Sequence, residues 1–131
     1  MEPLQGAGGG RTRRAVVLIG DLLIGSRVRD TLRRLGIEAD FVPSPAQLED
    51  AVSLPASILI IDLGESRFEP IGVIGAARAR GIRVLAFGSH VDAAGLQAAR
   101  EAGADRVVPR SAFASGHAGL IEELTGQDGR G

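Results

Sequence analysis

The chain has 131 residues, a length typical of one domain, and its 15 basic and 16 acidic residues leave a formal net charge of −1. This balance offers no electrostatic footprint for nucleic acid or an anionic membrane, so we expect neither as a partner. Cysteine is absent, which excludes disulfides, thiolate metal sites and cysteine nucleophiles. No apolar run approaches the roughly 20 residues of a membrane span and no signal peptide is visible, so we expect a cytoplasmic protein.

The first 14 residues are rich in glycine and arginine, with Gly6, Gly8, Gly9 and Gly10 close together. Glycine at this density does not recover the entropy lost on ordering, so residues 1–14 are predicted to be a disordered tail. Their G-x-G pattern does not predict a dinucleotide site, because that fingerprint follows a strand and this pattern precedes the first one.

Five strand–helix pairs follow in the order of the chain. Short apolar runs bounded by glycine, proline or charged residues predict the strands, and apolar positions at helical spacing predict the helices. The predicted strands are 15–19, 37–42, 57–62, 83–87 and 106–108. The predicted helices are 22–35, a short one from the Ser44–Gln47 capping box to about 52, 70–80, 92–102, and a last one to about 124 that Gly116 would break. The folded domain is therefore expected at 15–124, with a flexible tail at 125–131.

This alternation predicts an α/β fold with a parallel sheet covered on both faces. The third predicted strand is almost purely apolar, as in a central strand, whereas the second alternates in the manner of an edge strand. Right-handed crossovers then favour the strand order 2-1-3-4-5, a flavodoxin-like (βα)5 three-layer sandwich. Asp62 ends the third strand, at the edge of the sheet where such folds collect their ligands.

Three stretches of this chain resemble the response-regulator receiver domain, the phospho-accepting module of two-component signalling related to the chemotaxis regulator. They are the first strand with its acidic end (residues 17–21), the third strand with its terminal aspartate (58–62), and residues 98–108. The resemblance covers about residues 15–124. It implies that Asp62 is the phospho-acceptor equivalent and that Asp21 and Asp62 hold a magnesium ion.

The same comparison shows departures from the receiver pattern. Receivers carry two acids after the first strand, and here the pair is Gly20–Asp21. The Ser or Thr after the fourth strand corresponds to Gly88, with Ser89 one residue late, and the lysine after the fifth strand corresponds to Arg110. Arginine keeps the positive charge but not the compact shape of lysine. Two carboxylates would bind magnesium weakly, so this metal site is expected to be vestigial.

These losses favour a degenerate pseudo-receiver, because phosphoryl transfer needs its charge neutralised by metal and cation. We therefore expect a stand-alone, non-enzymatic signalling module without a cofactor, acting through protein–protein contacts. Two alternatives stay open. One is a receiver phosphorylated through Asp62 with weak magnesium binding, and the other is a flavodoxin-like protein that binds a small molecule through Asp21 and Asp62. Asp62 in a purely structural turn is equally compatible with the pseudo-receiver. Two interpretations of Arg110 stay open, a residue of the Asp62 pocket and a solvated loop charge.

The resemblance also implies an interaction face. It lies on the helix 92–102, the strand 106–108 and the last helix, and its predicted residues are His90, Gln97, Arg100, Arg110 and Phe113. The expected partner is another signalling protein or a second copy of the chain. The apolar run Leu22-Leu23-Ile24 is expected to begin the first helix and to pack on the sheet.

Overall fold

The computed structural model of the chain describes residues 13–129, with side chains described to Gly126, and its centre is a five-stranded parallel sheet. The strands are β1 (Arg13–Leu18), β2 (Ile37–Phe41), β3 (Ile58–Asp62), β4 (Arg83–Gly88) and β5 (Arg106–Pro109). Their order in the sheet is β2-β1-β3-β4-β5, which confirms the predicted topology and places β2 at an edge. The predicted disordered tail falls, for residues 1–12, outside the described residues.

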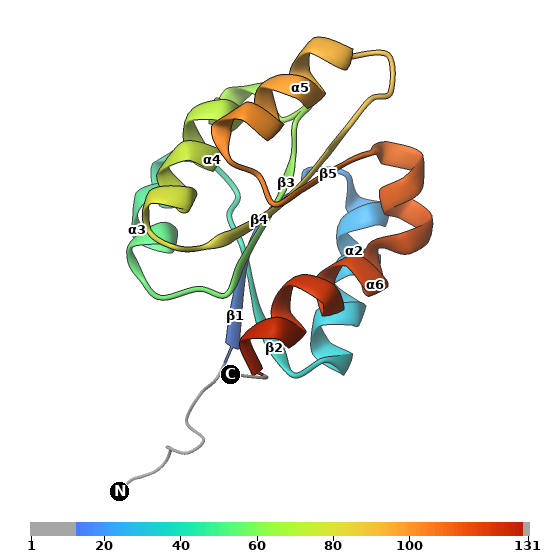
Figure 1. Cartoon of the computed structure of the whole chain (residues 1–131). Coiled ribbons are helices and arrows are strands. Elements are labelled where there is room, and N and C mark those ends of the chain that lie inside the picture. Colours follow the sequence, from blue (N-terminus) through green and yellow to red (C-terminus); the bar gives the residue numbers. More distant parts are fainter. Residues whose placement is uncertain (1–12, 130–131) are drawn as a thin grey trace, which may run out of the picture.

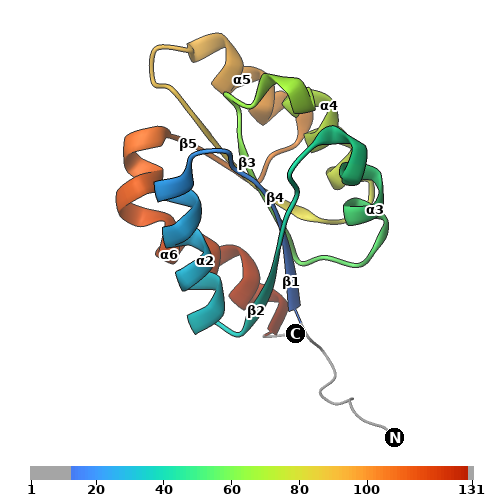
Figure 2. The ribbon, with the colours of Figure 1, turned by 180° about the vertical axis from the view of Figure 1, so that it is seen from behind.

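Helices cover both faces of this sheet. The helical segments are α2 (Leu22–Arg34), η1 (Pro45–Gln47), α3 (Leu48–Ser53), η2 (Ser66–Phe68), α4 (Pro70–Ala79), α5 (Ala93–Ala102) and α6 (Arg110–Gly129). Helices α3, α4 and α5 lie on one side of the sheet and α2 and α6 on the other, as Figures 1 and 2 show from opposite sides. The three-layer sandwich is thus confirmed.

Two apolar clusters fill the space between the layers. Alternate residues of each central strand point to opposite faces, so neighbouring side chains of β3 enter different clusters. Leu59 and Ile61 pack toward α4 and α5, whereas Ile58 and Ile60 pack toward α2 and α6. All of β3 is buried, including its terminal Asp62, as expected for the central strand of a covered parallel sheet.

The first strand begins at Arg13, two residues before the predicted start. Arg13 donates from Nη2 to the carbonyl of Leu35 at 3.0 Å, and Arg14 donates from Nη2 to the carbonyl of Ala51 at 2.8 Å. Long arginine side chains therefore close the end of the sheet opposite the carboxyl edge. The sequence analysis assigned both arginines to the tail, because they follow a glycine-rich stretch, and did not foresee these contacts.

The last helix corrects two predictions. It runs unbroken to Gly129, so Gly116 does not interrupt it and the predicted tail from residue 125 is helical at its start. Buried Phe113, Ile121 and Leu124 hold this helix on the sheet. A glycine inside a helix costs only about 1 kcal/mol, which this packing exceeds.

The segment Ser44–Gln47 is a further correction. It forms the 3-10 helix η1 before α3, and the Ser44 hydroxyl donates to the side-chain oxygen of Gln47 instead of accepting from the backbone of the helix. The predicted capping box is therefore wrong. No helix in the described part of the chain combines the length and apolar character needed to cross a bilayer.

Candidate functional site

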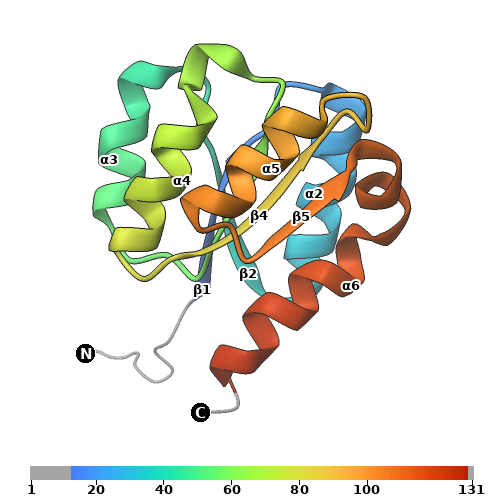
Figure 3. The same ribbon diagram turned by 45° about the horizontal axis from the view of Figure 1, so that its top comes forward.

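The candidate site lies at the carboxyl edge of the sheet, where the loops after β1, β3, β4 and β5 meet (Figure 3). Parallel strands end at the same edge, so residues far apart in the sequence converge there. Asp62 is the last residue of β3 and is 3% exposed. A carboxylate at this depth requires partners, because burial of an unpaired charge is strongly unfavourable.

Asp62 receives two donors on one oxygen. Arg110 Nη2 donates to Asp62 Oδ1 at 2.8 Å, and the backbone N–H of Gly64 donates to the same atom at 2.8 Å. The N–H of Glu65 donates to the carbonyl of Asp62 at 3.0 Å and closes a tight turn. A β-carbon at Gly64 would lie 3.2 Å from Oδ1, so glycine permits the close approach of this loop.

Arg110 is held in place by an aromatic pair. Its guanidinium carbon lies 5.2 Å from the centre of the Phe87 ring, and Phe87 stacks on Phe113 with ring centres 4.0 Å apart. The cation therefore meets a carboxylate on one side and an aromatic ring on another. The structure thus places Arg110 in the pocket of Asp62, with its side chain 38% exposed, and not in solution as a free loop charge.

Asp21 caps α2 in this structure, and its role as a metal ligand stays a prediction. Its Oδ1 accepts a hydrogen bond from the N–H of Ile24 at 3.0 Å, which makes Asp21 the N-cap of α2, and the residue is exposed. Aspartate is among the most favourable residues at this position. The structure pairs Asp62 with Arg110 and records no contact between Asp62 and Asp21.

Glu65 is a site residue that the sequence analysis did not single out. Its Oε2 accepts a hydrogen bond from the N–H of Gly20 at 3.1 Å, and its other oxygen lies 3.6 Å from Arg67 Nε. A β-carbon at Gly20 would collide with this carboxylate. The loop after β3 thus fills the space that a side chain at position 20 would need. Two features of the sequence could have indicated this contact: an acidic residue in the loop after β3, and Gly20 at a position where the receiver pattern has an acid.

The donor set fits magnesium poorly. Mg²⁺ demands near-octahedral coordination by several oxygens. Within residues 13–129 no group of three acidic or histidine side chains is placed to hold a metal ion. The carboxylates of Asp21, Asp62 and Glu65 each accept a hydrogen bond from the protein. We therefore derive no chemistry through a metal at this site.

Gly88 stands where the receiver pattern has a Ser or Thr hydroxyl, and the space beside it is filled by Leu63. A β-carbon at Gly88 would lie 3.2 Å from the β-carbon of Leu63, so a serine there would require Leu63 to move. Ser89, one residue later, is exposed and accepts a hydrogen bond from the N–H of Val91 at 3.3 Å. The described contacts of Ser89 therefore do not include Asp62.

The apolar run at the start of α2 is not packed on the sheet. Leu22 is 88% exposed and Leu23 is 64% exposed, so the predicted packing of these two residues is wrong, while Ile24 is half-buried. Within the first turn of α2, Ile24 packs against the apolar cluster between the sheet, α2 and α6, whereas Leu22 and Leu23 are not part of that cluster. The rim of the site is consequently apolar.

The predicted interaction face needs one change. His90, Gln97 and Arg100 are exposed, and Arg110 is partly exposed beside Asp62. Phe113 is fully buried under its stack with Phe87, so this residue belongs to the core and not to the face. Helical spacing places Phe113 on α6 but does not tell which side of α6 meets the sheet.

Comparison with known proteins finds similar solved structures but no match at the level of sequence. No protein-family model and no curated protein matches the sequence. Among solved structures, a response regulator receiver protein from Burkholderia phymatum shares 23% identity at a TM-score of 0.72, covering 88% of this chain and 96% of that one. A receiver domain protein from Methanospirillum hungatei shares 16% identity at a TM-score of 0.75, covering 92% and 99%.

A signal receiver domain from Bermanella marisrubri shows the same likeness, with 21% identity, a TM-score of 0.74 and coverage of 87% of this chain and 98% of that one. Each comparison extends over nearly the whole of the solved chain. Identities this low establish architecture and leave the activity of the site to its own residues. The chain therefore has the fold of response-regulator receiver domains.

Proposed function

We propose that this protein is a receiver-like signalling module that acts through protein–protein contacts, without phosphorylation of Asp62. The observation that carries the proposal is the ion pair between Arg110 and Asp62, closed at 2.8 Å on a carboxylate that is almost fully buried. Gly64 donates to the same oxygen. Asp62 then serves as a structural anchor that joins the loop after β3 to the start of α6.

Phosphoryl transfer to Asp62 would require several groups that this site lacks or uses otherwise. A carboxylate oxygen must attack phosphorus, and the charge on the transferring group must be neutralised by metal and cations. Here Oδ1 is engaged by two donors, and the carboxylates of Asp21 and Glu65 accept backbone hydrogen bonds. The place of the hydroxyl is occupied by Leu63. These features support a module without phosphorylation.

The contact surface that we propose is the exposed part of the α5–β5–α6 side. His90, Gln97 and Arg100 lie on it, and Arg110 connects its edge to Asp62. Gln97 donates to Glu101 at 3.1 Å, and Arg100 donates to Gln97 at 3.4 Å, so this part of α5 presents an ordered polar surface. The partner is another signalling protein or a second copy of this chain.

One observation favours a second candidate function, a receiver that is phosphorylated weakly through Asp62. Arg110 places a positive charge beside Asp62, which is the charge that a phosphoryl group would need. For this function the guanidinium would have to leave the Oδ1 atom and contact the phosphoryl oxygens instead.

An NMR titration separates the two candidates. Amide spectra of the ¹⁵N-labelled protein are recorded with magnesium, and then with beryllofluoride, which mimics a phosphoryl group. We expect no saturable shifts at residues 62–65 and 110–111, and the Asp62→Asn variant serves as the matched control. Saturable shifts at these residues in the wild type, absent from the Asp62→Asn variant, would establish the phosphorylatable receiver instead.

A further inference from the structure

A pocket of about 480 Å³ opens beside the ion pair, on the side of α2 and α6. The start of α2, the loop after β4 and the first turn of α6 enclose it, so three separate segments build its walls. Ligand pockets in proteins commonly measure about 300–1,000 Å³, and in open α/β sheets they lie outside the carboxyl ends of the strands. This pocket meets both conditions.

Two arginines give the pocket its charge. Arg27 lines it from α2 and has no hydrogen-bond or ion-pair partner within the described residues. Arg110 lines it from α6 and uses Nη2 for Asp62, which leaves other N–H groups of a half-exposed guanidinium available. Asp21 also lines the pocket, with Oδ1 engaged in capping α2. The carboxylates of Asp62 and Asp21 offset the two positive charges, so an anion would be held by the available N–H donors of the arginines and not by a net positive charge.

The remaining walls combine apolar surface with a few polar groups. Leu23, Ile24 and Ala114 contribute apolar side chains, and Ser89, His90 and Ser111 contribute side chains able to form hydrogen bonds. A mostly apolar cavity with a few polar groups is the usual composition of a site for a small organic molecule. Leu23, exposed to 64%, has apolar area that such a molecule would cover.

We propose that this pocket binds a small organic anion with an apolar body, with its carboxylate or phosphate head on Arg27 and Arg110. Arginine presents a fork of donors that matches both head groups. The apolar body lies against Leu23, Ile24 and Ala114. Arg110 belongs to this pocket and to the Asp62 ion pair, so a bound anion contacts the residue that neutralises Asp62.

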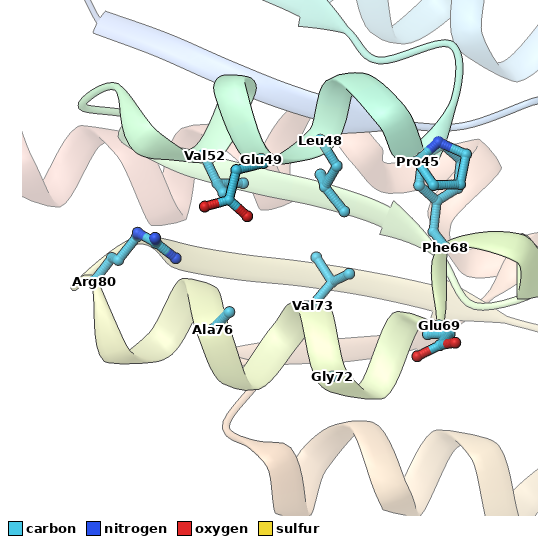
Figure 4. Close-up of a pocket in the computed structure, with 10 residues that line it drawn as sticks. All are labelled: Pro45, Leu48, Glu49, Val52, Phe68, Glu69, Gly72, Val73, Ala76 and Arg80. Atoms are coloured by element: carbon cyan, nitrogen blue, oxygen red, sulfur yellow. The ribbon is translucent and has the colours of Figure 1, made fainter.

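The groove between α3 and α4 is a weaker candidate (Figure 4). Its volume is about 270 Å³, and apolar side chains line it, with Leu48 on α3 and Val73 on α4 pointing toward each other. Its charged residues are Glu49, Glu69 and Arg80, so two carboxylates face one cation and do not favour an anionic head group. Of these two pockets, the one beside Arg110 has side chains that select a class of ligand.

The test is an NMR titration of the full chain, without metal or phosphodonor, so its outcome does not depend on the proposed function. The probes are 1-naphthoate and 1-naphthyl phosphate as amphipathic anions, 1-naphthalenemethanol as the neutral analogue, and inorganic phosphate as a head group alone. The Arg27→Gln variant is compared with Arg33→Gln, which removes an exposed arginine from the same helix outside the pocket.

We expect saturable shifts at residues 21–27, 89–90 and 110–114 with at least one anionic naphthyl probe, and weaker binding of the neutral probe and of inorganic phosphate. Loss of one charge-assisted contact in Arg27→Gln should lower affinity about ten- to a hundredfold, with Arg33→Gln unchanged. Tighter binding of the carboxylate or of the phosphate probe identifies the natural head group. Equal binding of the neutral probe, equal affinity of Arg27→Gln, or no saturation in these segments would overturn the proposal.

Discussion

The ion pair between Arg110 and Asp62 makes the sharpest prediction about stability. The substitution Arg110→Gln removes the cation and leaves the buried carboxylate with the N–H of Gly64 as its remaining donor on Oδ1. Breaking a fully buried pair by removing one partner costs about 3–5 kcal/mol. The side chain of Arg110 is 38% exposed, so water reaches the gap and the expected cost falls to about 1.5–3 kcal/mol.

A double-mutant cycle isolates this interaction. Asp62→Asn keeps the shape of the side chain and removes its charge, and the freed guanidinium can be hydrated, so we expect a loss of about 1 kcal/mol. Once Asp62 is neutral, Arg110→Gln no longer strands a charge. The destabilisation of the double variant should therefore be about 1–2 kcal/mol smaller than the sum of the two single destabilisations.

The assay is urea unfolding followed by far-ultraviolet circular dichroism, because the chain has neither tryptophan nor tyrosine. Arg106→Gln is the matched control: Arg106 pairs with Glu123 at 2.6 Å, but both side chains are at least 40% exposed. Such a surface pair contributes about 0–1 kcal/mol. Equal losses for Arg110→Gln and Arg106→Gln, or additivity of the Arg110 and Asp62 substitutions, would refute the anchoring role of the pair.

Three further predictions, each about one position near the site, are tested by the same unfolding assay. Gly88→Ala should destabilise the protein by about 1–3 kcal/mol, because the new β-carbon meets Leu63. The control Gly116→Ala, in open space on α6, should stabilise it by about 0.5–1 kcal/mol. Equal effects of the two substitutions would contradict the close contact at Gly88. Phe113→Ala should cost about 3–5 kcal/mol, since the ring is fully buried, and a loss typical of a surface residue would return it to the interaction face. Asp21→Ala should cost about 1 kcal/mol through loss of the helix cap, with Asp21→Asn nearly neutral, and no difference between the two would argue against capping.

The fold could be predicted from the sequence because its signals are local and consistent. The apolar run that ends at Asp62 indicates a central strand, and the alternation after Gly36 indicates an edge strand, so the strand order follows. Gly36, Gly81 and Gly103 all have positive φ at helix ends, in accord with their positions after predicted helices.

The site could be predicted only in part. Sequence reasoning placed Asp62 at the carboxyl edge of the sheet and left Arg110 open between a pocket role and a solvated loop charge. The contact of Arg110 with Asp62 depends on how α6 begins, which no local pattern describes. The placement of Glu65 against Gly20 is likewise a tertiary contact between residues 45 positions apart. The burial of Phe113 depends on which side of α6 faces Phe87.

The central claim is that Asp62 serves as the partner of Arg110 and not as a phosphoryl acceptor. Intact-mass spectrometry after incubation with acetyl phosphate and magnesium tests it most directly, with a phosphorylatable receiver as positive control and Asp62→Asn as the matched variant. The account predicts an unchanged mass for the wild type. A stoichiometric, magnesium-dependent gain of one phosphoryl group that is lost in Asp62→Asn would contradict it.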